Sequence, residues 1–189
     1  MRTLLVAGLG NPEPSYAQTR HNVGFLFVDD LGRAWPCNAQ KRDAVVGICA
    51  PQRGLKVLLA KPEAFVNESG AAILRLKRAH KIRNENIVIV HDDLDIEFGK
   101  VKISFDSGAG GHRGVESVIA SLKTKKFFRI RIGTATLGIR KARTKPEKTK
   151  NVFVKHFVLS PFSPGERRKL PALFQQAREM LLSRLIQSS

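Results

Sequence analysis

The chain has 189 residues and a formal net charge of +17, from 33 Lys and Arg against 16 Asp and Glu. This length suits one globular domain with a substantial core, and the charge favours a polyanionic partner, most simply nucleic acid. The sequence argues against a membrane protein, because no apolar stretch reaches membrane-spanning length and no long amphipathic basic helix stands out.

The first half of the chain alternates predicted strands and helices. Apolar runs predict strands over residues 4–9, 44–49, 55–60 and 87–90, and helical spacing of apolar residues predicts helices over 22–33 and 67–79. The segment 51–54, Pro-Gln-Arg-Gly, predicts a hairpin between the second and third strands. The last strand is apolar throughout, which is typical of a strand buried on both faces.

The second half continues the alternation. We expect strands over 101–105, 127–132 and 152–159, a helix over 115–122 and a C-terminal helix over about 164–187. Residues 163–166 form a capping box, whereas Pro171 requires either a separate first turn or a kink. Residues 138–150 are basic and aperiodic, which predicts a mobile loop. Residues 1–189 are therefore predicted to form a single α/β domain with a mixed sheet.

The two cysteines, Cys37 and Cys49, have neither metal-ligand spacing nor a CxxC pattern, so we expect two free thiols in a reducing compartment. The N-terminal apolar run is too short for a signal peptide. Together these features predict an intracellular protein.

The segment 8–22 is the most informative part of the chain. It follows the first strand and contains Asn11, Tyr16 and His21, at a position where α/β proteins place their sites. Glu13 stands where a dinucleotide fingerprint requires its third glycine, which argues against that motif. His21 is either a surface residue or a proton acceptor, and the second alternative requires a partner elsewhere in the chain.

Asp92, Asp93 and Asp95 follow the most apolar strand and offer that partner. One carboxylate can orient a histidine, as in hydrolases, but a divalent metal site or a purely structural acidic turn also fits. Asn67 either caps a helix or points its amide at a substrate. The glycine-rich segment 107–114 is either a flexible connection or a loop whose N–H groups attract phosphate or an oxyanion.

Four segments resemble those of the bacterial-type peptidyl-tRNA hydrolase family. They are 8–25 (GLGNPEPSYAQTRHNVGF), 61–70 (KPEAFVNESG), 91–104 (HDDLDIEFGKVKIS) and 107–119 (SGAGGHRGVESVI), and a weaker match extends to about residue 166. The resemblance implies a monomeric, cytoplasmic enzyme, or one of an organelle matrix. It also implies a single α/β globule with a mixed twisted sheet surrounded by helices, which needs no metal or organic cofactor. Its substrate would be peptidyl-tRNA, and hydrolysis of the ester at the 3′ end would release tRNA for translation.

The resemblance also assigns roles to residues. It implies that His21 is the general base, that Asp92 holds it, and that Asn11 positions water and peptide. Asn67 would bind the substrate carbonyl, while Tyr16 and Phe65 would line the region near the tRNA 3′ end. We further expect basic residues around the glycine-rich loop to bind tRNA phosphates: Lys100, Lys102, Arg113, Lys123, Lys125, Lys126 and Arg131.

Three positions depart from the family pattern. Arg113 replaces an Asn that contacts substrate in the family, Val66 replaces a Met, and Glu13 replaces a Gly. We hypothesise that Arg113 instead grips the terminal phosphate region of tRNA. The alternative function is a catalytically silent RNA-binding factor on the same scaffold, although the retention of Asn11, His21, Asn67 and Asp92 favours the enzyme.

Overall fold

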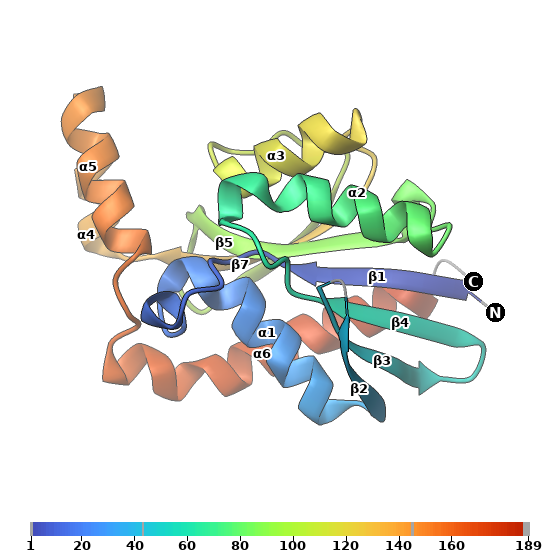
Figure 1. Ribbon diagram of the computed structural model, residues 1–189. Coiled ribbons are helices and arrows are strands. Elements are labelled where there is room, and N and C mark those ends of the chain that lie inside the picture. Colours follow the sequence, from blue (N-terminus) through green and yellow to red (C-terminus); the bar gives the residue numbers. More distant parts are fainter. Residues whose placement is uncertain (1, 43, 145, 187–189) are drawn as a thin grey trace.

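The computed structural model describes residues 2–42, 44–144 and 146–186. Its strands are β1 (Arg2–Gly8), β2 (Cys37–Arg42), β3 (Val45–Gln52), β4 (Leu55–Ala60), β5 (Ile87–Glu97), β6 (Val101–Phe105) and β7 (Phe128–Ala135). They form one seven-stranded sheet in the order β2-β3-β4-β1-β5-β7-β6 (Figure 1). The central strands β4, β1, β5 and β7 are parallel, and β2, β3 and β6 add antiparallel pairs at the two edges. The predicted mixed α/β sheet is thus confirmed.

Helices cover both faces of the sheet (Figure 1). One face packs against α1 (Val23–Ala34) and α6 (Pro164–Ile186), and the other against α2 (Ser69–Ala79) and α3 (Arg113–Leu122). Two apolar cores result, one on each face, because β1, β4 and β5 direct buried side chains to both sides. Within the described part of the chain, no helix has the length and apolarity to cross a bilayer.

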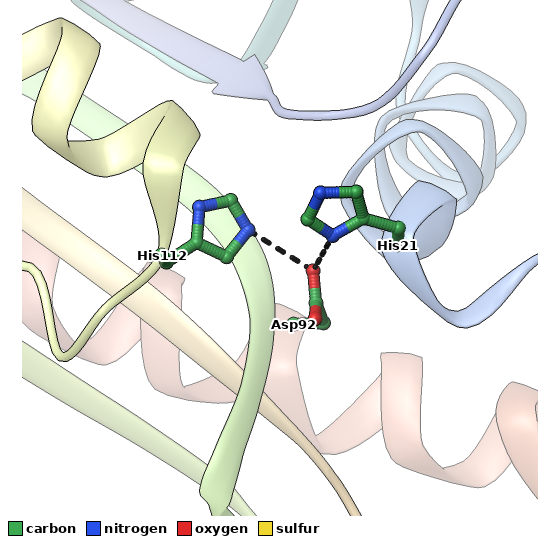
Figure 2. A group of neighbouring side chains, drawn as sticks. All are labelled: His21, Asp92 and His112. Carbon is green, nitrogen blue, oxygen red and sulfur yellow. Dashed lines mark hydrogen bonds and ion pairs between the residues drawn. The ribbon is translucent and has the colours of Figure 1, made fainter. Parts of the chain in front are cut away.

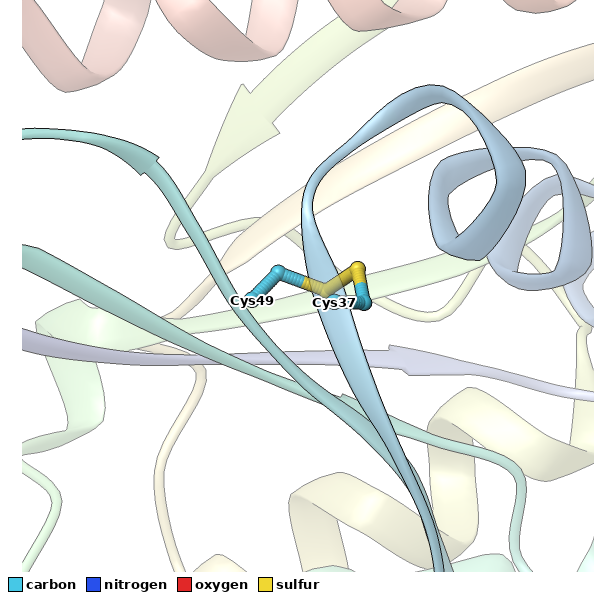
Figure 3. The surroundings of a disulfide bond; sticks show 2 residues. All are labelled: Cys37 and Cys49. Carbon is cyan, nitrogen blue, oxygen red and sulfur yellow. A yellow bond between two sulfur atoms is a disulfide. The ribbon is translucent and has the colours of Figure 1, made fainter.

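Most predicted elements are present, including the hairpin between β3 and β4. The strand β2 was not predicted, because its residues lack an apolar run and it forms the outer edge of the sheet. Its register with β3 places Cys37 directly opposite Cys49, and the two form a disulfide (Figure 3). The expectation of two free thiols is therefore wrong. The two cysteines are twelve residues apart in the sequence, and only the register of β2 with β3 shows that they face each other.

The expected mobile loop over 138–150 and the expected strand over 152–159 are wrong. The chain instead forms α4 (Leu137–Ala142) and α5 (Glu147–Val158), which stand together beside one end of the sheet (Figure 1). Residue 145, between them, lies outside the described residues. A small separate core explains the two helices, since buried Ile139 and Ala142 pack with Leu94, Val154 and Phe157. Such sparse apolar contacts leave little periodicity in the sequence.

The predicted capping box at the start of α6 is confirmed, because the Ser163 N–H donates to Glu166 Oε2 at 2.7 Å and the Glu166 N–H donates to Ser163 Oγ at 3.3 Å. The helix then runs unbroken through Pro171, so a separate first turn is wrong. Pro171 and Arg167 are both exposed, and water can therefore solvate the Arg167 carbonyl that the proline leaves without a donor.

Two glycines allow α1 to pack directly onto the carboxyl ends of β1 and β5. A Cβ on Gly24 would lie 2.4 Å from the Val90 carbonyl oxygen, and a Cβ on Gly8 would lie 2.2 Å from the Gly24 carbonyl oxygen. Both distances are shorter than a carbon–oxygen contact allows. The absence of side chains at these positions therefore fixes how closely the start of α1, and the turn before it, approaches β5.

We predict that Gly24→Ala lowers the free energy of unfolding by roughly 1–3 kcal/mol, because the added methyl group must push α1 off the sheet. The matched control is Gly32→Ala in the same helix, where a Cβ would meet only Leu59 Cδ1, at 3.9 Å. This control should be neutral or stabilising by about 0.5–1 kcal/mol. Urea denaturation measures both variants, and equal losses of stability would contradict the proposed role of the close approach.

Candidate active site

His21 and Asp92 meet, as the family resemblance led us to expect, but β5 continues past residue 90 to Glu97, so Asp92 lies within the strand rather than after it. His21 lies in the short 3-10 helix η2 (Arg20–Asn22), and its Nδ1 is 2.8 Å from Asp92 Oδ1 (Figure 2). The side chain of Asp92 is 3% exposed and that of His21 is 14% exposed. An ionised carboxylate can only accept, so Nδ1 carries the proton and Nε2 keeps its lone pair. Figure 2 shows Nε2 directed away from Asp92.

A second histidine, His112, donates to the same carboxylate oxygen. Its Nε2 is 3.0 Å from Asp92 Oδ1, while its Nδ1 accepts the Val115 N–H at 3.3 Å and so caps the start of α3 (Figure 2). The helix N-terminus thereby fixes the His112 tautomer with the proton on Nε2. His112 was not predicted as a site residue, although its position in the glycine-rich segment 107–114 marks it as a polar residue of a candidate loop.

These contacts determine the charges of the group. Burial acts to raise the pKa of Asp92, but the two imidazoles together lower it strongly, so the carboxylate stays ionised. Burial acts to lower the pKa of His21, but the Asp92 charge and hydrogen bond outweigh it and the net pKa is raised. His91, buried behind His112, has a pKa well below its ordinary value, mainly because of burial. His91 is therefore neutral, and its Nδ1–H donates to the Asp92 carbonyl at 2.7 Å.

Asn11 is held in place by hydrogen bonds of both its main chain and its side-chain amide. It is 6% exposed, its Oδ1 accepts the Val66 N–H at 2.9 Å, and its main chain exchanges two hydrogen bonds of 2.9 Å with the Asn22 side chain. Asn22 follows His21 in the chain, and Val66 precedes Asn67. Asn11 therefore connects the three loops that carry His21, Asn67 and Asn11 itself. Because its Oδ1 is occupied by the Val66 N–H, its Nδ2 is the side-chain atom that can donate to a ligand.

The turn that carries His21 is anchored by a buried arginine. Arg20 Nη1 donates to Ser160 Oγ at 2.7 Å and to the Pro161 carbonyl at 2.9 Å, and Nη2 donates to Glu166 Oε2 at 2.7 Å. Its guanidinium also lies 4.4 Å from the centroid of the Phe157 ring. Glu166 is the capping-box residue of α6, so one carboxylate binds both the start of that helix and the turn that carries His21. Sequence reasoning missed Arg20, because its partners lie some 140 residues away.

The residues predicted to contact substrate lie mostly at the protein surface. Phe65 is 45% exposed, Tyr16 is half-buried, and Asn67 and Arg113 are exposed. Asn67 lies in the 3-10 helix η3 (Val66–Glu68), and the N-cap position of α2 falls on Glu68 instead. Asn67 is thus not the cap of α2, and its amide stays available. Arg113 is the first residue of α3, directly after His112.

The three neighbouring carboxylates have different partners, which argues against the metal alternative at residues 92–95. Arg131 Nε donates to Asp93 Oδ2 at 2.7 Å, and Arg143 Nη1 donates to Asp95 Oδ1 at 2.5 Å. Another possible set of ligands is His21, Asp92 and His112, whose atoms lie within 4.8 Å of one another. In that group, however, both imidazoles already donate protons to the carboxylate.

The structure divides the predicted phosphate-binding residues into two groups. Val101, Ile132 and Asp92 lie in one row across β6, β7 and β5, so Lys100, Lys102, Arg113 and Arg131 lie at the catalytic end of the sheet. Lys100 forms an ion pair with Glu97 at 2.9 Å and Arg131 forms one with Asp93, whereas Lys102 and Arg113 are exposed and form no ion pair within the described part of the chain. Lys123, Lys125 and Lys126 precede β7 and lie at the opposite end.

Comparison with known proteins identifies close relatives. The family model described as peptidyl-tRNA hydrolase matches residues 5–188. The curated peptidyl-tRNA hydrolase of Mycobacterium tuberculosis (strain H37Rv) is 40% identical over 93% of this chain and 87% of its own, and that of Aquifex aeolicus is 39% identical over 94% and 88%. The crystal structure of the Acinetobacter baumannii peptidyl-tRNA hydrolase superposes with a TM-score of 0.78 at 26% identity, covering 98% of this chain and 91% of that one.

We predict that Asp92→Asn lowers the pKa of His21 below its ordinary value of about 6.5, because burial then acts without the carboxylate that opposes it. The matched control is Asp95→Asn in the same strand, an exposed carboxylate that pairs with Arg143. NMR titration of the His21 ring proton measures both variants. An unchanged pKa in Asp92→Asn would show that the pair does not control the protonation of His21.

Proposed function

Because the chain belongs to the peptidyl-tRNA hydrolase family, which cleaves the ester between a peptide and the 3′ end of tRNA, we propose that His21 is the general base of this reaction. The observation that carries the proposal is the 2.8 Å contact of His21 Nδ1 with Asp92, which leaves Nε2 free to accept a proton. The raised pKa of His21, which the Asp92 charge and hydrogen bond cause, makes Nε2 a stronger proton acceptor.

In the proposed mechanism, His21 Nε2 takes a proton from water while the water oxygen bonds to the ester carbonyl carbon. Asp92 stabilises the imidazolium that forms, as an acidic partner does in other hydrolases. The carbon–oxygen bond to the ribose then breaks, and the proton on His21 passes to the 3′ oxygen of the departing tRNA. His112 keeps Asp92 ionised and oriented by donating a second hydrogen bond.

The amides of Asn11 and Asn67 are the proposed donors to the substrate. Asn11 has its Oδ1 occupied by the Val66 N–H, so it offers Nδ2 to the water, the peptide or the developing oxyanion. Asn67 is exposed on η3, directly after Val66, and would bind the substrate carbonyl. One oxyanion donor typically contributes about 10²–10³-fold to the rate. Tyr16 and Phe65 would contact the region near the tRNA 3′ end.

The exposed Lys102 and Arg113 support a tRNA phosphate site at the catalytic end of the sheet, with Lys100 and Arg131 held nearby by their acidic partners. A catalytically silent RNA-binding role is not favoured, because His21 and Asp92 are in hydrogen-bond contact and Asp92 is ionised. A monomer acting in the cytoplasm or an organelle matrix, without a metal or organic cofactor, remains our prediction.

We predict that His21→Ala lowers kcat by about 10²–10⁴-fold, since general-base catalysis is typically worth that much. Release of free tRNA from an N-blocked aminoacyl-tRNA, in the presence of a chelator, provides the measurement. The control is His156→Ala, which removes an exposed imidazole from α5 and should keep wild-type kcat. Tight tRNA binding by wild type without turnover would instead support the RNA-binding alternative.

We predict that Arg113→Asn raises KM for this substrate several-fold and reduces the dependence of KM on salt, because one phosphate contact is lost. The comparison is Glu116→Gln, a neutralisation one turn later on the exposed part of α3, which should not raise KM. If Arg113→Asn binds tRNA as tightly as wild type, Arg113 does not grip a phosphate.

A further inference from the structure

The end of the sheet opposite the catalytic pair carries a second concentration of positive charge. α2 follows β4, α3 precedes β7, and both helices run back along parallel strands, so both end at the amino edge of the sheet (Figure 1). α2 and α3 pack against each other, and the Gly70 N–H donates to Ser117 Oγ at 3.0 Å. Their carboxyl ends and the turns that follow therefore contribute to one surface.

We call this the amino-edge basic surface, and it consists of seven exposed cationic side chains: Arg75, Arg78, Lys81, Arg83, Lys123, Lys125 and Lys126. The one acidic neighbour paired with them in the described residues is Glu85, at 3.5 Å from Arg83 Nε. The large exposed apolar side chain at this edge, among the described residues, is Phe105, which stacks on Phe128 at the start of β7, and none belongs to α2, α3 or the turns that follow them. The surface therefore suits a phosphate backbone better than a membrane or an apolar partner.

Two of these lysines occupy positions where the backbone favours glycine. Lys81 has φ 52° and Lys123 has φ 54°, both in the left-handed region. At the end of α2 the Ile82 N–H donates to the Lys77 carbonyl at 2.9 Å and the Lys81 N–H donates to the Arg78 carbonyl at 3.2 Å, the pattern in which glycine normally follows the cap. A lysine at each position is strained, so both cations occupy positions where the backbone favours glycine.

We propose that the amino-edge basic surface binds the phosphate backbone of the duplex stem of the tRNA whose 3′ end occupies the catalytic site. The inference rests on the proposed function. α3 joins the two regions, since it begins with Arg113 beside His112 and ends next to Lys123, and its ten residues span about 15 Å. A duplex lying along this side of the protein would contact cations at both ends of α3.

A purely structural role would be stabilisation of the helix ends, because cations interact favourably with the carboxyl end of a helix. The two roles predict opposite changes in the stability of the protein when these lysines are replaced by glycine. Replacing Lys81 and Lys123 with glycine removes two charges but also relieves two left-handed lysines. A helix-stabilising role predicts a loss of stability, whereas the proposed role predicts more stable protein that binds tRNA less well.

The test is the double variant Lys81→Gly/Lys123→Gly, with Lys81→Gln/Lys123→Gln as the charge-matched control that keeps the strain. We expect the glycine variant to gain about 2–4 °C in Tm and the glutamine variant to gain nothing. In both, the slope of log affinity for intact deacylated tRNA against log salt should fall in magnitude by about 2, because each lost phosphate contact removes about 0.9. Arg168→Gln/Lys169→Gln, two exposed cations on α6, should leave the slope unchanged.

A short substrate separates this inference from the proposed function. An N-blocked aminoacyl ester on a 3′ oligonucleotide without the stem should be hydrolysed by both lysine variants as by wild type, while KM for the intact substrate rises. Equal effects on the two substrates, or an unchanged salt slope for intact tRNA, would overturn the proposal. Failure of wild type to hydrolyse either substrate would refute the proposed function. The salt dependence of tRNA binding would then still test, on its own, whether the amino-edge basic surface binds tRNA.

Discussion

The site depends on one buried carboxylate oxygen that accepts hydrogen bonds from two imidazoles. Asp92 Oδ1 receives His21 at 2.8 Å and His112 at 3.0 Å while its side chain is almost fully removed from water. A buried carboxylate without partners would take up a proton, and it would then no longer stabilise a positive charge on His21. The two donors keep Asp92 ionised, and each is fixed by a different element, His21 by η2 and His112 by the start of α3.

The fold brings these elements together through its central parallel strands. β1 and β5 are neighbours, so the loop after β1 and the last buried residues of β5 share one edge of the sheet. Gly8 and Gly24 let α1 approach this edge more closely than any side chain would permit. Asn11 then fastens the loop after β1 to the segment after β4 through the Val66 N–H. The geometry of the candidate site is thus set by main-chain contacts as much as by side chains.

The sequence predicted the central strands and the helices on both faces, because apolar runs and helical spacing are local signals. Polar strand ends indicated an acidic partner for His21 among residues 92–95, and the family resemblance identified it as Asp92. The sequence did not predict β2, α4 or α5, since an edge strand and a small satellite core need few apolar residues. The Cys37–Cys49 disulfide and the salt bridge of Arg20 with Glu166 depend on sheet register and on packing between distant segments. The family resemblance indicated Asn11 and Asn67, whereas the contact of His112 with Asp92 became apparent only in the structure.

The shared carboxylate of Glu166 has a consequence for the order in which the molecule is assembled. All seven strands precede residue 136 among the described residues, so the sheet can form before the segment 160–166 joins it. Until that segment docks, Arg20 lacks the carbonyls and the carboxylate that hold it, and the turn bearing His21 has no support on that side. During synthesis from the N-terminus, the turn bearing His21 would therefore gain this support only when the beginning of α6 emerges.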